Sequence, residues 1–187
     1  MDTDKNILIR ESRKLCNTID EALAKVGSEY INKIPEKFYI EIDGDLLDQP
    51  GIICHQCNTC STIEESYSGL AKTMFTKFPH ANVYADGCEK TLGTVILRDN
   101  VANLIAQKFG GKPSPPRVGD RDSKKDREVY FASCLNELLS IAQGKVVSFP
   151  RFIGCNIAGG DWPTYKEIID DFARDHDNDV FIVTYKS

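Results

Sequence analysis

The chain lacks most of the features that mark membrane-spanning, secreted or nucleic-acid-binding proteins. Its 187 residues contain no apolar run near the roughly 18 residues that a membrane span needs. The first residues, MDTDKNILIRESRK, hold no apolar core of a secretory signal. Positive charge is in deficit, with 23 Lys and Arg against 28 Asp and Glu, whereas a nucleic-acid surface is usually basic. We therefore expect a cytoplasmic globular protein that binds neither nucleic acid nor membrane.

The seven cysteines do not suggest a disulfide framework, because their number is odd and no secretory signal is recognised. Three of them, Cys54, Cys57 and Cys60, lie in the segment CHQCNTC, and thiolates at this spacing can hold zinc or an iron–sulfur cluster. Cys88 or Cys155 could supply a fourth ligand. However, no second CxxC motif or Cys/His pair occurs, and Cys54 continues the apolar run GII. We expect no metal and no cofactor, with a metal centre as the alternative.

Hydrophobic periodicity predicts strands that alternate with helices. Apolar alternation or short apolar runs predict strands over 37–42, 51–54, 92–99, 145–150 and 179–186, and favour a strand over a short helix for 101–109. Helical spacing predicts helices over 6–26, 68–78, 127–143 and 161–176. The stretch 110–127, rich in Pro, Gly and charge, is predicted to be a surface loop. The alternation is typical of an α/β fold with a largely parallel sheet, and we divide the chain into an N-terminal helical extension, 1–36, and an α/β domain, 37–187.

Ligands of parallel sheets bind where the carboxyl ends of strands lead into helices. One such segment, GCNIAGGDW, is rich in glycine, and its backbone N–H groups can approach a diphosphate closely. A second, SGLA, opens the helix predicted over 68–78. Neither segment contains GxGxxG or the lysine of a P-loop. Together they predict a pyrophosphate site without basic side chains. Asp161 is also a candidate N-cap, with Pro163 in the first turn of its helix.

These segments resemble the macro domain family, an α/β fold that binds ADP-ribose. The resemblance is carried by GDLLDQPGIICHQCNTC, SGLAKTMFTKFP and FPRFIGCNIAGGDW, in matching order over about residues 38–186. HQCN and the FGG at 109–111 are similar to motifs of the ADP-ribose-1″-phosphate phosphatase branch. The resemblance implies a macro-domain-like three-layer α/β/α sandwich with a mixed, largely parallel central sheet.

The resemblance also assigns roles to individual residues. Asp45 would accept a hydrogen bond from the adenine amino group. Asn58 would lie near the distal ribose, and Phe109 would cover that ribose. His55 would act as a general acid or position the scissile phosphate, as an imidazole that titrates near neutrality can. Asp161 would act on water. The expected catalytic residues are His55, Asn58 and Asp161, and the expected ligand-binding residues are Gly44, Asp45, Leu46, Ser68, Gly69, Leu70, Phe109, Gly154, Cys155, Asn156, Ile157, Ala158 and Gly159.

Two departures from the family pattern bear on the mechanism. In the second loop, Tyr67 and Ser68 stand where the family usually carries glycines. Relatives that remove ADP-ribose from acidic side chains use a lysine and an aspartate, whose positions are taken here by Gln107 and Ala158. We therefore do not expect the lysine-dependent mechanism.

The expected function is hydrolysis at the distal ribose of bound ADP-ribose, with ADP-ribose-1″-phosphate converted to ADP-ribose and phosphate. The chain would then be a phosphoric monoester hydrolase. Two alternatives stay open: a non-catalytic reader of ADP-ribose or a related NAD-derived nucleotide, and a hydrolase that removes ADP-ribose from its target. The expected ligand is ADP-ribose or a derivative, and an ADP-ribosylated protein is a further candidate partner.

Overall fold

A single six-stranded sheet forms the centre of the molecule. The structure, a computed structural model, describes residues 37–62, 69–113 and 122–186. The strands are β1 (Ile40–Asp43), β2 (Ile52–Asn58), β3 (Val95–Arg98), β4 (Val101–Gln107), β5 (Val147–Pro150) and β6 (Val180–Thr184). Their order is β1-β6-β5-β2-β4-β3. Every neighbouring pair is parallel except β3 with β4, so the prediction of a mixed, largely parallel sheet is confirmed.

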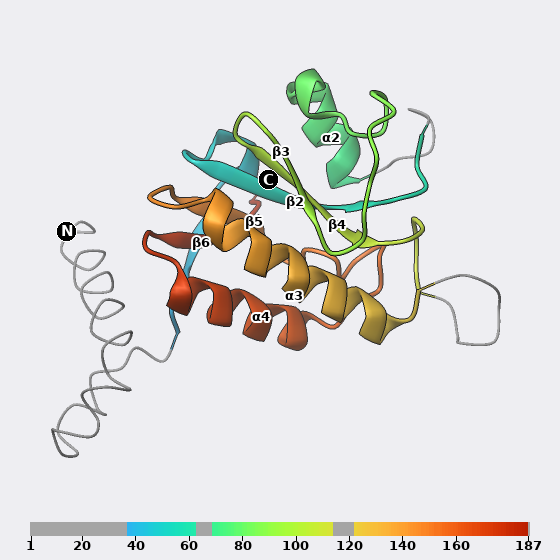
Figure 1. Cartoon of the computed structure of the whole chain (residues 1–187). Coiled ribbons are helices and arrows are strands. Elements are labelled where there is room, and N and C mark those ends of the chain that lie inside the picture. The colour runs from blue at the N-terminus through green and yellow to red at the C-terminus, as the bar shows by residue number, and fades with distance from the viewer. Residues whose placement is uncertain (1–36, 63–68, 114–121, 187) are drawn as a thin grey trace, which may run out of the picture.

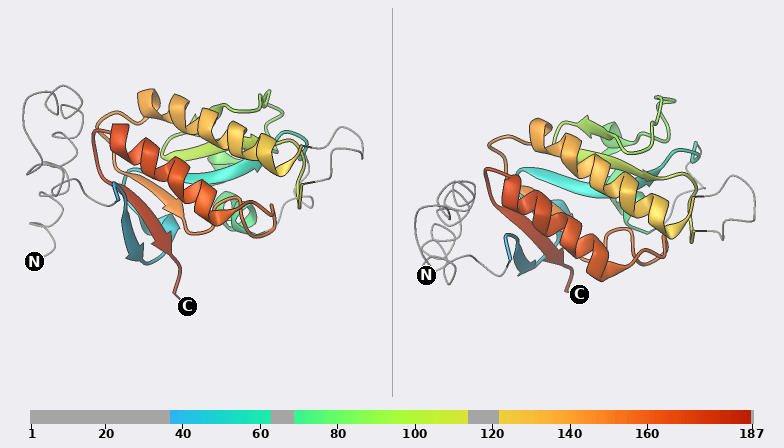
Figure 2. Two further views of the ribbon diagram at one scale, coloured as in Figure 1. Left: turned by 90° about the horizontal axis from the view of Figure 1, so that it is seen from below. Right: turned by 60° about the horizontal axis from the view of Figure 1, so that its bottom comes forward.

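Helices cover both faces of this sheet (Figure 1 and Figure 2). One face carries α3 (Lys124–Ile141) and α4 (Trp162–Asp175), which pack on each other over the larger hydrophobic cluster. The other face carries α2 (Leu70–Lys77) and the short 3-10 helices η2 (Leu46–Asp48) and η4 (Pro79–Ala81), over a second cluster. The predicted three-layer α/β/α sandwich is therefore confirmed. In the described part of the chain, no helix is long and apolar enough to cross a membrane.

Alternation of side chains along β2 separates the closely spaced cysteines. Cys54 packs into the cluster under α3 and α4, whereas Cys57 packs into the cluster under α2. Cys60 lies beyond the end of the strand and is exposed. The three thiols therefore cannot converge on one ion. Among the described residues, no group of three or more His, Cys, Asp or Glu side chains is arranged to hold a metal.

Most predicted elements are present, and two of the differences in their bounds bear on the site. The strand predicted over 51–54 continues to Asn58, so all of HQCN belongs to β2. The predicted loop 110–127 is wrong at its end, because α3 already begins at Lys124. Ser123 and Asp126 form a reciprocal capping box there, and this spacing can be recognised in the sequence. The helix predicted over 6–26, and with it the proposed extension, lies outside the described residues.

A buried arginine in the first turn of α3 holds two loops together. Arg127 occupies the apolar face of the helix and is only 1 % exposed. Its guanidinium donates to the backbone carbonyls of Gly111 at 2.7 Å, Ala158 at 2.8 Å and Phe109 at 3.2 Å. The loop that follows β4 is therefore bound to the loop that follows β5 through one side chain.

The charge of Arg127 is balanced by Asp122, which is equally buried. The two side chains form an ion pair with 2.8 Å between guanidinium nitrogen and Oδ1. The other carboxylate oxygen of Asp122 accepts from the backbone N–H of Lys108 at 2.6 Å. Every oxygen of this carboxylate thus has a partner, as a buried charge requires.

We predict that Arg127→Met lowers the free energy of unfolding by about 3–5 kcal/mol, because it leaves a buried carboxylate without its counter-ion and takes a donor from three backbone carbonyls. Arg127→Lys should recover only part of this loss, since an ammonium cannot reach all four acceptors. Urea unfolding measures both. The control is Arg98→Met, because Arg98 pairs with Asp86 at the surface and should contribute less than about 1 kcal/mol. We call Arg127 and Asp122 the clamp, because they hold the two loops together. Equal losses for the two Met variants would contradict this role.

Candidate functional site

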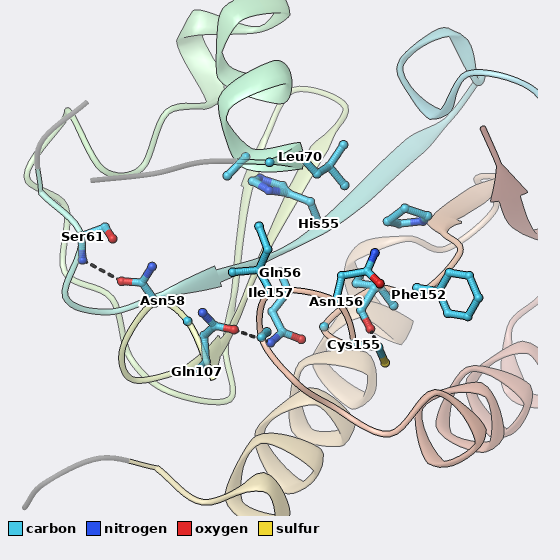
Figure 3. A pocket seen from close by; sticks show the side chains of 18 of the residues that line it. His55, Gln56, Asn58, Ser61, Leu70, Gln107, Phe152, Cys155, Asn156 and Ile157 are labelled. Atoms are coloured by element: carbon cyan, nitrogen blue, oxygen red, sulfur yellow. Dashed lines mark hydrogen bonds between the residues drawn. The ribbon is translucent and has the colours of Figure 1, made fainter. Parts of the chain in front are cut away.

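A cleft runs along the carboxyl ends of the five parallel strands. It consists of two adjoining hollows of about 720 and 580 Å³, each within the roughly 300–1,000 Å³ usual for small-molecule sites. Their walls share Leu70, Pro150, Arg151 and Phe152, so the two hollows adjoin along these residues. Figure 3 shows side chains of the first hollow. The first hollow extends to the ends of β2 and β4, and the second to those of β1 and β6.

The second hollow contains the residues predicted to meet an adenine. Asp45 and Leu46 line it, together with the exposed Tyr185. The Asp45 carboxylate also caps η2, because Oδ1 accepts from the backbone N–H of Leu47 at 2.9 Å. Gly44, also predicted to bind ligand, precedes Asp45 but does not line the hollow.

Two loops face each other across the first hollow. One is the start of α2, where Gly69 has φ +60° and Leu70 follows. The other is the loop after β5, of which Gly154, Cys155, Asn156, Ile157 and Ala158 line the hollow, as predicted, while Gly159 does not. A Cβ on Gly69 would lie 3.2 Å from Cδ1 of Ile157, so the two loops approach closely. Ser68 lies outside the described residues.

His55 borders the cleft but is almost entirely buried beneath α2. It is 1 % exposed, its Nε2 lies 2.7 Å from Oδ1 of Asn103, and its ring meets the Phe75 ring edge-on at 5.1 Å. The amide nitrogen of Asn103 donates to the carbonyl of Ile96, so its oxygen faces the imidazole and accepts from Nε2–H. Burial lowers the pKa of His55 to about 4, against the opposing effect of the Asn103 hydrogen bond. The imidazole is therefore neutral at neutral pH, and its Nε2–H donates a hydrogen bond to Asn103.

Asn58 lies at the end of β2, where it lines the cleft and shapes the turn that follows. Its Oδ1 accepts from the backbone N–H groups of Cys60 at 3.0 Å and Ser61 at 2.7 Å. Its backbone N–H and Nδ2 both donate to the Tyr84 hydroxyl, at 3.0 and 3.2 Å. The side chain predicted to contact a distal ribose is thus held rigidly at the wall of the first hollow (Figure 3).

The structure does not bring Asp161 or the Phe109 side chain to the cleft wall. Asp161 caps α4, with Oδ2 accepting from the backbone N–H of Thr164 at 3.2 Å and Oδ1 from Lys124 Nζ at 3.2 Å. The hydrogen bonds to Thr164 are the main cause that lowers the pKa of Asp161. The N-cap prediction is confirmed. The backbone carbonyl of Phe109 accepts a hydrogen bond from Arg127.

Sequence reasoning missed the amide side chains on the floor and an aromatic stack on the wall. Gln56 and Gln107 both line the first hollow and are joined by a hydrogen bond of 2.7 Å. Arg151 stacks on Phe152, with 4.8 Å from its guanidinium carbon to the ring centroid, and Phe152 contacts Trp162 in turn. A signal existed for Phe152, because a large residue follows a strand end just before the glycine-rich loop.

Exposed apolar side chains gather around the cleft. The described residues include five large apolar side chains that are exposed. Four of them line the cleft: Leu70, Phe152, Ile157 and Tyr185. Such clustering marks a surface that binds a partner or ligand.

Comparison with solved structures identifies the fold. The macrodomain of Mycobacterium tuberculosis DarG is 19 % identical, with a TM-score of 0.59 over 80 % of this chain and 99 % of that one. The Thermus aquaticus DarG macrodomain is 20 % identical, with a TM-score of 0.56 over 79 % and 97 %. An Oceanobacillus iheyensis macrodomain with ADP is 16 % identical, with a TM-score of 0.50 over 79 % and 82 %. No family model and no curated protein matches the sequence. The chain therefore has the macrodomain fold.

The burial of His55 predicts an acid-sensitive fold. The unfolded chain binds a proton at this imidazole below pH 6.5, whereas the folded chain does so only near pH 4. The stability is thus fully present above pH 6.5 and is lost as the pH falls towards 4, by up to about 3 kcal/mol. Urea unfolding between pH 7 and pH 4 measures this loss. His55→Phe should flatten that part of the profile, while the control His80→Gln, at an exposed histidine, should not. Equal slopes in native and His55→Phe chains would contradict this account.

Proposed function

We propose that the chain binds ADP-ribose, or a close derivative, along the cleft. The observation that carries this proposal is that the two hollows adjoin along the carboxyl ends of five parallel strands. Such a cleft suits an elongated ligand with a base at one end and a second sugar at the other. The macrodomain fold supports the proposal, and so does the O. iheyensis macrodomain with ADP, which forms one part of ADP-ribose.

The proposed placement follows the chemistry of the walls. The adenine lies at Asp45, whose carboxylate can accept from an exocyclic amino group. The diphosphate lies between Gly69 and the loop after β5, where Gly154 lets the backbone approach. The distal ribose lies near Asn58, at the other end of the cleft.

Hydrolysis of ADP-ribose-1″-phosphate is the catalytic form of this proposal, supported by the polar end of the first hollow. Asn58 and Ser61 stand there beside the Tyr84 hydroxyl. His55 is neutral at neutral pH, and its Nε2–H is engaged in a hydrogen bond to Asn103. Its geometry therefore does not favour a general acid. Asp161 lies outside the cleft wall as an N-cap. The binding form, a reader of ADP-ribose, is therefore better supported than the phosphatase.

Removal of ADP-ribose from a protein side chain is supported less well. The lysine of such relatives is replaced by Gln107, whose Nε2 donates to the carbonyl of Phe109 at 3.1 Å. A carboxamide cannot take over the chemistry of an ammonium group. An ADP-ribosylated protein thus fits the cleft better as a ligand than as a substrate.

Calorimetric titration with ADP-ribose tests the binding proposal. We expect one site per chain and a loss of about tenfold in affinity for Asp45→Asn, because an amide keeps the cap on η2 but presents fewer acceptors to the adenine amino group. The control is Asp48→Asn, an exposed residue of the same short helix that does not line the cleft. A native chain that takes up no ADP-ribose would contradict the proposal.

Phosphate release from ADP-ribose-1″-phosphate separates the reader from the phosphatase. The reader predicts release no faster than in the blank. Release by the native chain that is lost in Asn58→Ala, with ADP-ribose still bound, would establish the phosphatase instead. Release that also survives in His55→Ala would remove the imidazole from that mechanism.

A further inference from the structure

Two glutamine side chains from neighbouring strands form a hydrogen-bonded pair on the floor of the first hollow. Gln56 extends from β2 and Gln107 from β4, and Nε2 of Gln56 donates to Oε1 of Gln107 at 2.7 Å. Both side chains line the hollow, and Figure 3 shows them directed toward each other. Gln107 is 7 % exposed and Gln56 is half-buried.

An irregularity in the sheet brings these two side chains together. Cys57 pairs with Ile105 and Asn58 with Gln107, so Ala106 is an extra residue in β4. An extra residue of this kind turns the side chain that follows it, and such irregularities occur often beside functional sites. Without it, Gln107 would keep the face of Ile105, which packs under α2.

The orientation of both amides is fixed by the clamp. The carbonyl of Phe109 accepts from Arg127 at 3.2 Å and from Nε2 of Gln107 at 3.1 Å. Because a carbonyl oxygen can only accept, the amide atom of Gln107 that faces it must be the nitrogen, and the oxygen of Gln107 is directed to Gln56. Gln56 in turn directs its own oxygen to the opposite side, where a Cβ on Gly154 would lie only 2.5 Å from it.

The oriented pair has hydrogen-bonding capacity beyond these contacts. Each carboxamide nitrogen carries two N–H groups and each carbonyl oxygen two lone pairs. The bonds above use one N–H of each amide and one lone pair of Gln107, whereas Oε1 of Gln56 is buried without a hydrogen-bond partner among the described residues. The floor therefore offers donors and an acceptor side by side, without charge. Among the described residues that line this hollow, Arg151 is the one charged side chain, since His55 is neutral. A vicinal diol, which donates and accepts at once, matches such a floor.

We propose that Gln56 and Gln107 determine specificity for the part of the ligand beyond the diphosphate, by binding the vicinal hydroxyl groups of the distal ribose. This inference rests on the proposed binding of ADP-ribose. The pair acts as a neutral recognition element on the floor of the first hollow. The pair thereby gives the uncharged floor a role in recognition rather than in acid–base catalysis.

The test compares three ligands by calorimetry: ADP-ribose, ADP, and ADP-ribose whose distal sugar lacks the 2″-hydroxyl. The native chain should bind ADP-ribose at least about tenfold more tightly than ADP, and should lose part of that preference for the deoxy ligand. Gln107→Met and Gln56→Met should each lower the affinity for ADP-ribose by about tenfold and the affinity for ADP by less than about twofold. The variants should also no longer distinguish the deoxy ligand from ADP-ribose.

The matched control is Gln143→Met, which makes the same chemical change at an exposed residue in the turn before β5. Thermal unfolding is recorded for every variant, and Gln56→Met, at the less buried site, carries the test if Gln107→Met does not fold. Equal weakening of ADP and ADP-ribose, or an unchanged preference between them, overturns this inference alone. A native chain that binds neither nucleotide overturns the proposed function, and this inference with it.

Discussion

The ion pair between Arg127 and Asp122 is the constraint on which the cleft depends. Both side chains are buried, and removal of either would leave the other charge without a partner in a low-dielectric interior. Within the described part of the chain, the remaining hydrogen bonds of the guanidinium go to loop carbonyls, so they fix the loop after β4 against the loop after β5. The cost of burying this charge is thus balanced by an arrangement that holds two walls of the cleft in place.

The polar groups of the cleft floor take their orientation from this clamp. The carbonyl of Phe109 accepts from both Arg127 and Gln107, and Gln107 then accepts from Gln56. The floor is consequently rigid and uncharged, while the rim carries exposed apolar side chains. These properties favour recognition of a flat base and a sugar over acid–base catalysis. His55 agrees with this picture, because its burial keeps it neutral and stabilises the packing of α2 on the sheet.

The fold could be predicted from the sequence because its signals are local. Apolar periodicity defined the strands and helices, and the order of the motifs indicated the macrodomain fold. Asp45 and the loop around Gly154 could be placed for the same reason, since they directly follow strand ends. Gln56 and Gln107 could not, because an extra residue in β4 brings them together. Arg127 was missed because it continues an apolar helix face, and the burial of His55 depends on Phe75 from another layer.

A crystal structure of the chain with ADP-ribose would show whether the nucleotide binds along the cleft. We expect one nucleotide in the cleft, with its adenine amino group at the Asp45 carboxylate. The diphosphate would lie between the two glycine-containing loops, and the distal ribose hydroxyls within hydrogen-bonding distance of Gln56 and Gln107. A nucleotide bound elsewhere, or a distal ribose directed away from the amide pair toward solvent, would contradict it.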